Sequence, residues 1–209
     1  MIRVLITDDH MIVREGLRQI VSETRDISVV AEAATASEAL DRLREVEVDV
    51  VVLDLNLPDR HGVDLLAHIQ SMYPRSPVLI LSVHREPDYA IRLMKAGAAG
   101  YVSKDAAREQ LVEAIRVVSH GEKYLESDIA TSVALRLVSH GDESAHERLT
   151  DREFQIMLLI AGGKPPREIA SELGLSVRTI GAHRAKILEK TNLRNNAEIV
   201  QYALKHQLL

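Results

Sequence analysis

The chain has 209 residues, 46% of them hydrophobic and 27% charged, which suffices to bury a core and excludes a chain disordered by composition. It contains no cysteine, so disulfides, thiolate catalysis and cysteine-based zinc sites are excluded. The net charge is −5, but residues 148–209 carry ten Lys/Arg against six Asp/Glu, whereas residues 1–147 carry sixteen against twenty-five, and this asymmetry predicts two domains with different partners.

The N-terminal stretch MIRVLITDDH leads directly into a strand and lacks the apolar segment typical of a signal peptide. No apolar run approaches the roughly 20 residues that cross a bilayer. We therefore expect a cytoplasmic protein without a membrane partner.

Short apolar runs alternate with helical periodicity over the first 120 residues. The strand-like runs are 3–9, 27–33, 49–55, 77–83 and 99–104. The amphipathic helical segments between and after them are 12–23, 36–46, 62–73, 87–97 and 107–121. This alternation predicts an α/β fold with a five-stranded, doubly wound parallel sheet, covered on both faces through right-handed crossovers.

The pattern changes after Gly121, and three regions follow from it. We expect a first domain over residues 1–120, a linker over 121–147 and a small all-α domain over 148–209. Residues 122–140 could form one helix within the linker. The last region fits four short helices at about 151–161, 166–173, 177–190 and 196–207, with Gly174 and Ser176 suited to end one helix and begin the next.

Charged and hydroxyl side chains stand at corresponding ends of the predicted strands. They are Asp8, Asp9, Asp54, Ser82 and Lys104. Ligands of a doubly wound sheet lie outside the carboxyl ends of its strands, so these side chains are expected to converge. Clustered carboxylates suit Mg²⁺, and a lysine with a hydroxyl suits phosphate oxygens, so the set predicts phosphoryl transfer to a carboxylate.

The stretches TDDH, VVLDLNLPDRHG, LILSVH and AGAAGYVSKD resemble the motifs of bacterial response-regulator receiver domains, over residues 1–120. The resemblance implies a flavodoxin-like fold and a phosphoacceptor role for Asp54. It further implies that Asp8, Asp9 and Asp54, with the backbone carbonyl of Asn56, hold Mg²⁺.

The same resemblance assigns roles to three residues around the phosphoryl group. Lys104 would contact it, Ser82 would form a hydrogen bond to it, and Tyr101 would change its orientation in response and turn inward. The phosphodonor would be a cognate histidine kinase or a small acyl phosphate.

The C-terminal stretches LTDRE, REIASELGLSVRTIGAHRAKILEK and NAEIVQYAL resemble the LuxR-type helix-turn-helix of the NarL/FixJ group. Several apolar side chains are expected to pack inward, namely Ile169, Ala170, Leu173, Val177, Ile180 and Ile187. The polar face of segment 177–190 is expected to contact DNA through Arg178, Thr179, His183, Arg184, Lys186 and Lys190.

These observations predict a two-component response regulator in which phosphorylation of Asp54 controls dimerisation and sequence-specific DNA binding, and thereby transcription. Its expected partners are DNA, a cognate histidine kinase and a second copy of the chain, with RNA polymerase as a further candidate. The chain is not expected to be a turnover enzyme.

Two rival hypotheses remain open at this point. The first is a phosphotransfer enzyme or phosphatase that uses the acidic crevice, which leaves the basic helix-turn-helix without a role. The second is a DNA-binding protein that works without phosphorylation and keeps a relic receiver. The complete set of crevice residues argues against the second, because a relic should have lost some of them.

Overall fold

The computed structural model describes the chain except for residues 61, 84–86, 140–144, 207 and 209. The chain forms two compact units, the first made of Met1–Arg85 and Tyr89–Thr131 and the second of Glu86–Asp88 and Ser132–Leu209. This division lies inside the helix α6 (Ser127–Ser139), within the predicted linker, of which residues 140–144 lie outside the described part. In the part of the chain that the structure describes, no helix is long and apolar enough to cross a membrane.

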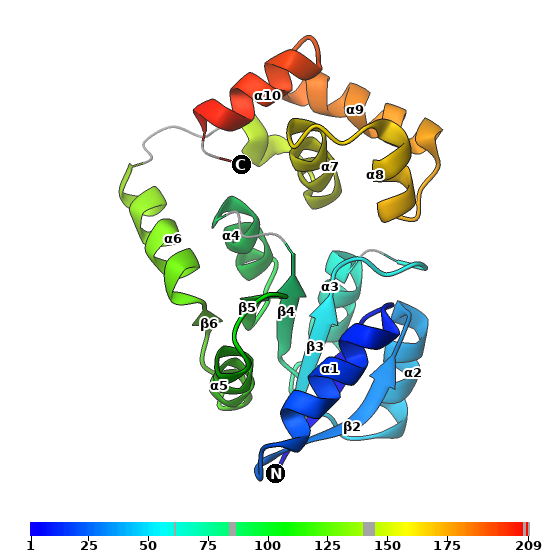
Figure 1. Ribbon diagram of the computed structural model, residues 1–209, viewed down its shortest axis with the longest axis vertical. Helices are drawn as coiled ribbons and strands as arrows, with labels where there is room; N and C mark the ends of the chain where they lie inside the picture. Colours follow the sequence, from blue (N-terminus) through cyan, green and yellow to red (C-terminus); the bar gives the residue numbers. More distant parts are fainter. Residues whose placement is uncertain (61, 84–86, 140–144, 207, 209) are drawn as a thin grey trace. The chain divides into compact units, whose positions relative to one another are not determined.

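The first unit is built on a single parallel sheet with the strand order β2-β1-β3-β4-β5-β6 (Figure 1). The strands are β1 (Ile2–Thr7), β2 (Ile27–Ala33), β3 (Val50–Asp54), β4 (Val78–Ser82), β5 (Gly100–Ser103) and β6 (Tyr124–Leu125). The chain order reverses next to β1, which creates the switch point at which doubly wound sheets place their ligands. The predicted α/β class and parallel sheet are confirmed.

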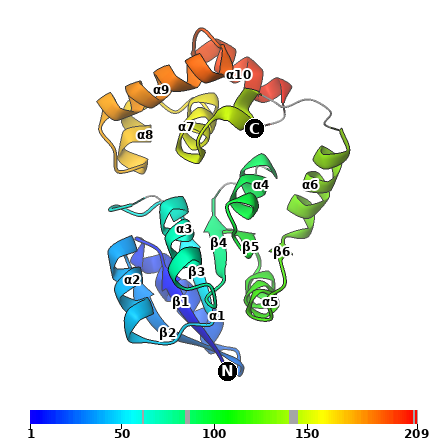
Figure 2. The same ribbon diagram turned by 180° about the vertical axis from the view of Figure 1, so that it is seen from behind.

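Helices cover the sheet on both faces, with α1 and α5 on one face and α2 and α3 on the other (Figures 1 and 2). Their bounds are α1 (Met11–Ser22), α2 (Ala36–Glu45), α3 (Gly62–Met72), α4 (Pro87–Lys95) and α5 (Arg108–Ser119). Each of these helices lies within two residues of its predicted position at both ends. Apolar periodicity alone therefore located them, because each has one apolar face to bury.

The core of the first unit is aliphatic. All residues of β3 and β4 are buried, as expected for central strands covered on both faces. Leu17 and Val21 of α1 and Leu111, Ile115 and Val118 of α5 belong to one apolar cluster with β1, β3 and β4. This packing fixes the strand ends, and hence the side chains that follow them.

A sixth strand was not expected from the sequence. The sequence allows one helix over residues 122–140, but Tyr124 and Leu125 pair with Gly100 and Tyr101 of β5. The carboxylate of Glu126 accepts a hydrogen bond from the backbone N–H of Ser103. These contacts with β5 hold the chain extended before α6 begins.

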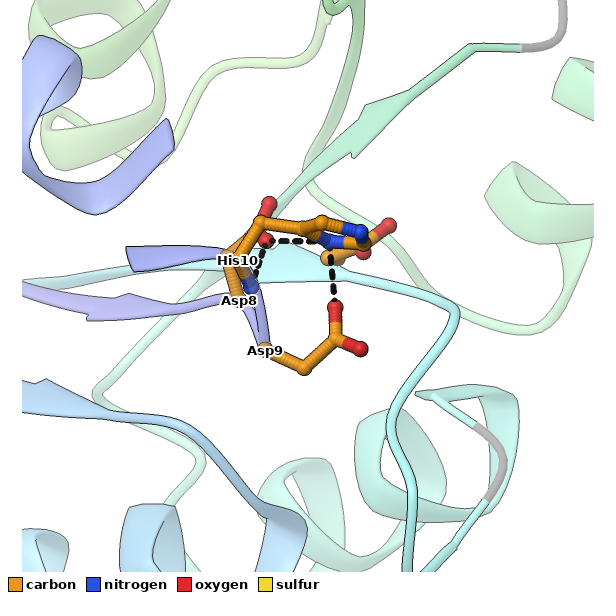
Figure 3. A group of neighbouring side chains, drawn as sticks. Asp8, Asp9 and His10 are labelled. Atoms are coloured by element: carbon orange, nitrogen blue, oxygen red, sulfur yellow. Dashed lines mark hydrogen bonds and ion pairs between the residues drawn. The ribbon is translucent and has the colours of Figure 1, made fainter. Parts of the chain in front are cut away.

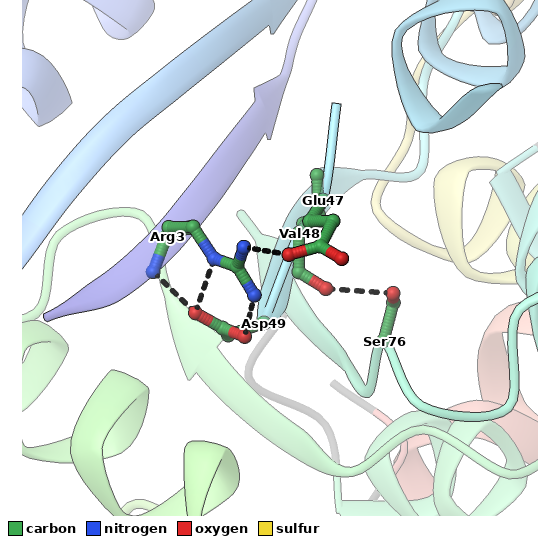
Figure 4. Close-up of polar contacts among 5 residues, drawn as sticks. All are labelled: Arg3, Glu47, Val48, Asp49 and Ser76. Carbon is green, nitrogen blue, oxygen red and sulfur yellow. Dashed lines mark hydrogen bonds and ion pairs between the residues drawn. The ribbon is translucent and has the colours of Figure 1, made fainter. Parts of the chain in front are cut away.

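At the opposite end of the sheet, Arg3 joins β1 to the segment that precedes β3 (Figure 4). Its guanidinium donates to both carboxylate oxygens of Asp49, from Nη2 at 2.8 Å and from Nε at 3.0 Å, and it also pairs with Glu47. Ser76 donates its hydroxyl to the carbonyl oxygen of Val48 at 2.8 Å. The first residues of neighbouring strands are thereby aligned.

The second unit is helical. After the 3₁₀ helix η1 (Ala145–Arg148) come α7 (Asp151–Ala161), α8 (Pro166–Glu172), α9 (Val177–Thr191) and α10 (Asn196–Lys205). Three of these helices start at a side-chain cap, from Thr150, Ser176 and Asn195 respectively. Gly174 has a φ of +62° in the turn between α8 and α9, a conformation that favours glycine.

Five of the six apolar residues expected to pack inward are buried: Ile169, Ala170, Leu173, Ile180 and Ile187. Val177 is the exception, since 49% of it is exposed. It is the first residue of α9, immediately after the Ser176 cap. The prediction for Val177 was therefore wrong.

Candidate functional site

Three charged side chains meet at the carboxyl edge of the sheet, where the parallel register brings the strand ends together. Asp8 follows β1, Asp54 ends β3 and Lys104 follows β5. The ammonium nitrogen of Lys104 lies 2.7 Å from Oδ2 of Asp8 and 2.9 Å from Oδ2 of Asp54. Residues 8, 54 and 104 thus form one cluster, as the sequence predicted.

The two carboxylates of this cluster are nearly removed from water, with exposed side-chain fractions of 1% for Asp8 and 3% for Asp54. Burial raises the pKa of the Asp54 carboxyl above its ordinary value; the Lys104 ammonium opposes this rise and the Asp8 carboxylate adds to it. Burial would lower the pKa of Lys104, but the charges of Asp54 and Asp8 outweigh it and raise that pKa. One ammonium faces two carboxylates, so the cluster favours a further cation.

Asp9 and His10 extend the cluster at the start of α1 (Figure 3). One ligand atom from each of Asp8, Asp9, His10 and Asp54 lies within 4.8 Å of the others. The carboxylate oxygens of the three aspartates fit a hard divalent cation, and the acidic cluster is compatible with such a metal site. The three aspartates were predicted from the sequence, whereas His10 was not, although its place directly after two acids was a usable signal.

The loop after Asp54 is held in a fixed course. The backbone N–H of Asn56 donates to the Asp54 carboxylate, and the N–H of Gly62 donates to the carbonyl oxygen of Leu55 at 2.9 Å. A Cβ on Gly62 would lie 2.5 Å from the Cα of Leu55, so the close approach of the two backbones requires glycine there. The loop therefore keeps Asn56 beside the acidic cluster.

Ser82 and Tyr101 come from the neighbouring strands β4 and β5. Ser82 ends β4 and is 3% exposed, and its carbonyl oxygen accepts a hydrogen bond from the backbone N–H of Lys104 at 2.7 Å. Tyr101 is completely buried, so the structure has its ring in the inward position. Its change of orientation on phosphorylation stays a prediction.

On α9, the side chains expected to contact DNA have different surroundings. Arg178 and Lys186 are exposed, and Lys186 forms no hydrogen bond or ion pair with another residue that the structure describes. Thr179 is half-buried, with its hydroxyl 2.8 Å from that of Ser176 in the helix cap. Arg178 and Lys186 are therefore the candidates most available to a nucleic acid.

Two other residues of this set form hydrogen bonds within the second unit, and a third is half-buried. Nε of Arg184 donates to Oδ1 of Asn196 at 2.6 Å, and Nζ of Lys190 donates to Glu153 at 2.6 Å. His183 is half-buried, and its buried Nδ1 has no hydrogen-bond partner among the residues described. Burial lowers the pKa of His183, and the charge of Arg152 adds to this.

The Lys190 contact is a partly buried ion pair, in which Glu153 is only 3% exposed and the Lys190 side chain is 35% exposed. Burial would raise the pKa of the Glu153 carboxyl, but hydrogen bonds from Lys190 and Thr150 outweigh it and lower that pKa. The pair joins α9 to α7. In the observed structure, Lys190 thus serves the packing of the helices.

Comparisons with known proteins agree with this architecture. Response regulator UvrY of Escherichia coli (strain K12) is 38% identical over 209 residues, covering 100% of this chain and 96% of that protein. Oxygen regulatory protein NreC of Staphylococcus haemolyticus (strain JCSC1435) is 36% identical over 214 residues, covering 99% of each chain. The similarity therefore spans both units.

A solved structure and two families complete the comparison. RcsB from Salmonella enterica serovar Typhimurium, bound to promoter P1flhDC, shares the fold with a TM-score of 0.67 at 24% identity, over 96% of this chain and 97% of that one. Residues 4–116 match the response regulator receiver domain, and residues 147–203 match the bacterial regulatory proteins of the luxR family. The chain therefore belongs to the response regulators that join a receiver domain to a LuxR-type DNA-binding domain.

Proposed function

We propose that Asp54 is the phosphoacceptor and that its phosphorylation controls dimerisation and sequence-specific DNA binding. The observation that carries this proposal is the buried Asp54 carboxylate at a strand end, 2.9 Å from the Lys104 ammonium. An oxygen of Asp54 would attack the phosphorus of a phosphohistidine or acyl phosphate. The new P–O bond forms as the bond to the donor breaks, and the leaving group keeps that electron pair.

We propose Mg²⁺ as the cation of the acidic cluster. Asp8, Asp9 and Asp54, with the backbone carbonyl of Asn56, would hold it, and the close approach of their donor atoms supports this choice. When bound, the ion would neutralise the oxygens of the transferred phosphoryl group.

Around the phosphoryl group, Lys104 would donate from its ammonium and Ser82 from its hydroxyl. Both lie at strand ends next to Asp54, which supports these roles. Tyr101 would change its orientation between the phosphorylated and unphosphorylated states and be turned inward when the group is present. Because such receivers have two states, phosphorylation would shift a population between them.

In the second unit, we propose that α9 reads DNA through Arg178, Thr179, His183, Arg184 and Lys186, with Lys190 at its end. Arg178 and Lys186 support this best, because both are exposed. Two copies of the chain would place two such helices on half-sites about 10 base pairs apart. A cognate histidine kinase would act as phosphodonor, and RNA polymerase is a further proposed partner.

We propose that the protein acts in the cytoplasm, where a DNA-binding regulator finds its target. We also propose that it is not a turnover enzyme. The basic helix-turn-helix unit supports this, since a phosphatase or phosphotransfer enzyme would have no use for it. Steady release of phosphate from an added phospho-substrate would contradict the proposal.

The test combines intact mass and DNA binding in the same samples. Wild type and Asp54→Asn are incubated with acetyl phosphate and Mg²⁺, and each is assayed on operator candidates selected from random DNA. We expect one added phosphoryl group and tighter DNA binding only in the wild type. Equal binding of both proteins to DNA, with or without the donor, would favour a regulator that works without phosphorylation.

A further inference from the structure

The loop between β3 and α3 is tied to the helix α2 by Asp59, a residue to which the proposed phosphorylation chemistry gives no role. Oδ1 of Asp59 accepts a hydrogen bond from the backbone N–H of Ala36 at 2.8 Å. Oδ2 accepts two more from Ser37, from its backbone N–H at 2.9 Å and from its hydroxyl at 2.8 Å. Both carboxylate oxygens are therefore engaged, which fixes the orientation of the side chain as well as its position.

The start of α2 needs these acceptors, because the first N–H groups of a helix have no partner within it. Thr35 caps the helix and accepts a hydrogen bond from the N–H of Glu38 at 3.1 Å. The N–H groups of Ala36 and Ser37, the first two residues of α2, donate to Asp59 instead. A negative charge is also favourable at this end of a helix. The contact is thus both directional and electrostatic, and the chain itself occupies the end of α2.

Asn56, whose backbone carbonyl is proposed to bind the cation, lies in the same loop. The side chains on either side of it are buried, with exposed fractions of 2% for Leu55 and 7% for Leu57. They fix where the loop lies, but the peptide group between Asn56 and Leu57 can still rotate about the dihedral angles that flank it. Pro58 follows with its φ angle fixed, and Asp59 comes next. The helix-bound Asp59 therefore restricts the direction in which the Asn56 carbonyl points.

We propose that Asp59 is a positioning residue of the metal site: it holds the loop against α2 and so keeps the Asn56 carbonyl directed at the bound cation. This inference rests on the proposed function. A loop that is fixed before the ion arrives loses less conformational freedom on binding. Mg²⁺ requires near-ideal octahedral geometry, whereas Ca²⁺ accepts a flexible one. Loss of the Asp59 contact should therefore weaken the binding of Mg²⁺ more than that of Ca²⁺.

Three variants separate positioning from charge and from stability. Asp59→Ala removes the contact and a negative charge, whereas Asp59→Asn removes the charge but keeps a side-chain oxygen as acceptor. Thr35→Ala removes the cap of α2 and leaves Asp59 in place. Dissociation constants for Mg²⁺ and Ca²⁺ are measured by calorimetry on the full chain, without a phosphodonor. We expect about 10-fold weaker Mg²⁺ binding in Asp59→Ala and a smaller loss for Ca²⁺. Asp59→Asn and Thr35→Ala should bind Mg²⁺ close to the wild-type level.

Thermal unfolding in EDTA shows what each variant does to the fold itself. Asp59→Ala and Thr35→Ala each remove a partner of the first turn of α2, so both should lower the midpoint. Only Asp59→Ala should weaken metal binding. Equal losses of Mg²⁺ affinity in these two variants would make Asp59 a structural cap and would overturn the positioning role. A loss in Asp59→Asn as large as that in Asp59→Ala would show that the charge acts directly and would overturn it too.

Hydrogen exchange of the metal-free protein reports on the loop directly. The backbone N–H of Asn56 donates to the Asp54 carboxylate, and its exchange should be faster in Asp59→Ala than in the wild type. Unchanged exchange at Asn56, or unchanged Mg²⁺ affinity, in Asp59→Ala would overturn the role of Asp59 alone. Absence of Mg²⁺ binding by the wild type would overturn the proposed metal site itself.

Discussion

Two lysines of α9 show how neighbours decide the role of a residue. Lys186 is exposed on the helix face expected to meet DNA, whereas the Lys190 ammonium lies 2.6 Å from the buried carboxylate of Glu153. Loss of Lys190 would leave that carboxylate without its counter-charge, which costs far more than loss of a solvated charge. The two residues therefore allow a matched comparison.

We expect Lys190→Met to lower the free energy of unfolding of the second unit by about 1–3 kcal/mol. Lys186→Met should leave that stability within about 0.5 kcal/mol. Lys186→Met should instead reduce the slope of the logarithm of the DNA-binding constant against the logarithm of the salt concentration by about 1. Urea unfolding and salt titrations of DNA binding measure the two effects. A stable Lys190→Met that loses DNA affinity would show that the lysine contacts DNA.

At the scale of elements, the short β6 strand depends on one buried carboxylate. Glu126 is 7% exposed and accepts the hydrogen bond of the Ser103 N–H, itself 1% exposed. Glu126→Ala should lower the free energy of unfolding of the receiver unit by about 1–3 kcal/mol, because it leaves a buried donor unpaired. Glu126→Gln keeps an acceptor oxygen and should cost less. Chemical unfolding and hydrogen exchange at the Ser103 amide test this, and equal losses in both variants would contradict it.

The ion pair that aligns β1 with β3 predicts a dependence of stability on pH. Hydrogen bonds from Arg3 hold the pKa of the Asp49 carboxyl below its ordinary value. Because the pKa of this carboxyl is lower in the folded than in the unfolded protein, the ion pair stabilises the fold at pH values above about 3.9, the pKa in the unfolded chain. This stabilisation is lost as the pH falls through the pKa of the folded protein. Asp49→Asn should remove it, costing about 0.5–1 kcal/mol at pH 7 and little in acid.

The role of Asp49 is checked by measuring the free energy of unfolding in urea at a series of pH values from neutral into acid. Glu47→Gln is the control, because its carboxylate also pairs with Arg3 but is 84% exposed. We expect Glu47→Gln to follow the wild-type curve closely. If the free energy of unfolding of Asp49→Asn ran parallel to that of the wild type over the whole pH range, Asp49 would not cause the pH dependence.

For the whole molecule, the division into two compact units predicts that metal acts on one of them. The acidic cluster belongs entirely to the receiver unit, so Mg²⁺ should stabilise that unit, by about 2.7 kcal/mol at a concentration 100 times the dissociation constant. Scanning calorimetry should then show one transition that moves with Mg²⁺ and one that does not. Equal shifts of both transitions would indicate that the units unfold together.

Much of the fold was legible in the sequence, because parallel strands and amphipathic helices bury apolar residues at characteristic periods. The helices of both units appear close to their predicted positions. The strand β6 was missed because two residues carry no periodicity of their own, and only their pairing with β5 makes them a strand. Val177 was misplaced because the apolar pattern alone did not show that the first residue of α9 is exposed.

The sequence by itself determined the acidic cluster, since Asp8, Asp54 and Lys104 follow from the rule that parallel strand ends share one edge. Only the tertiary structure decided what surrounds them. The contact of His10 with Asp9 depends on the course of the chain between β1 and α1, and the pairing of Lys190 with Glu153 on the packing of α9 against α7. Residue type and spacing fix which groups are available, whereas side-chain partners are set by distances that only the folded chain defines.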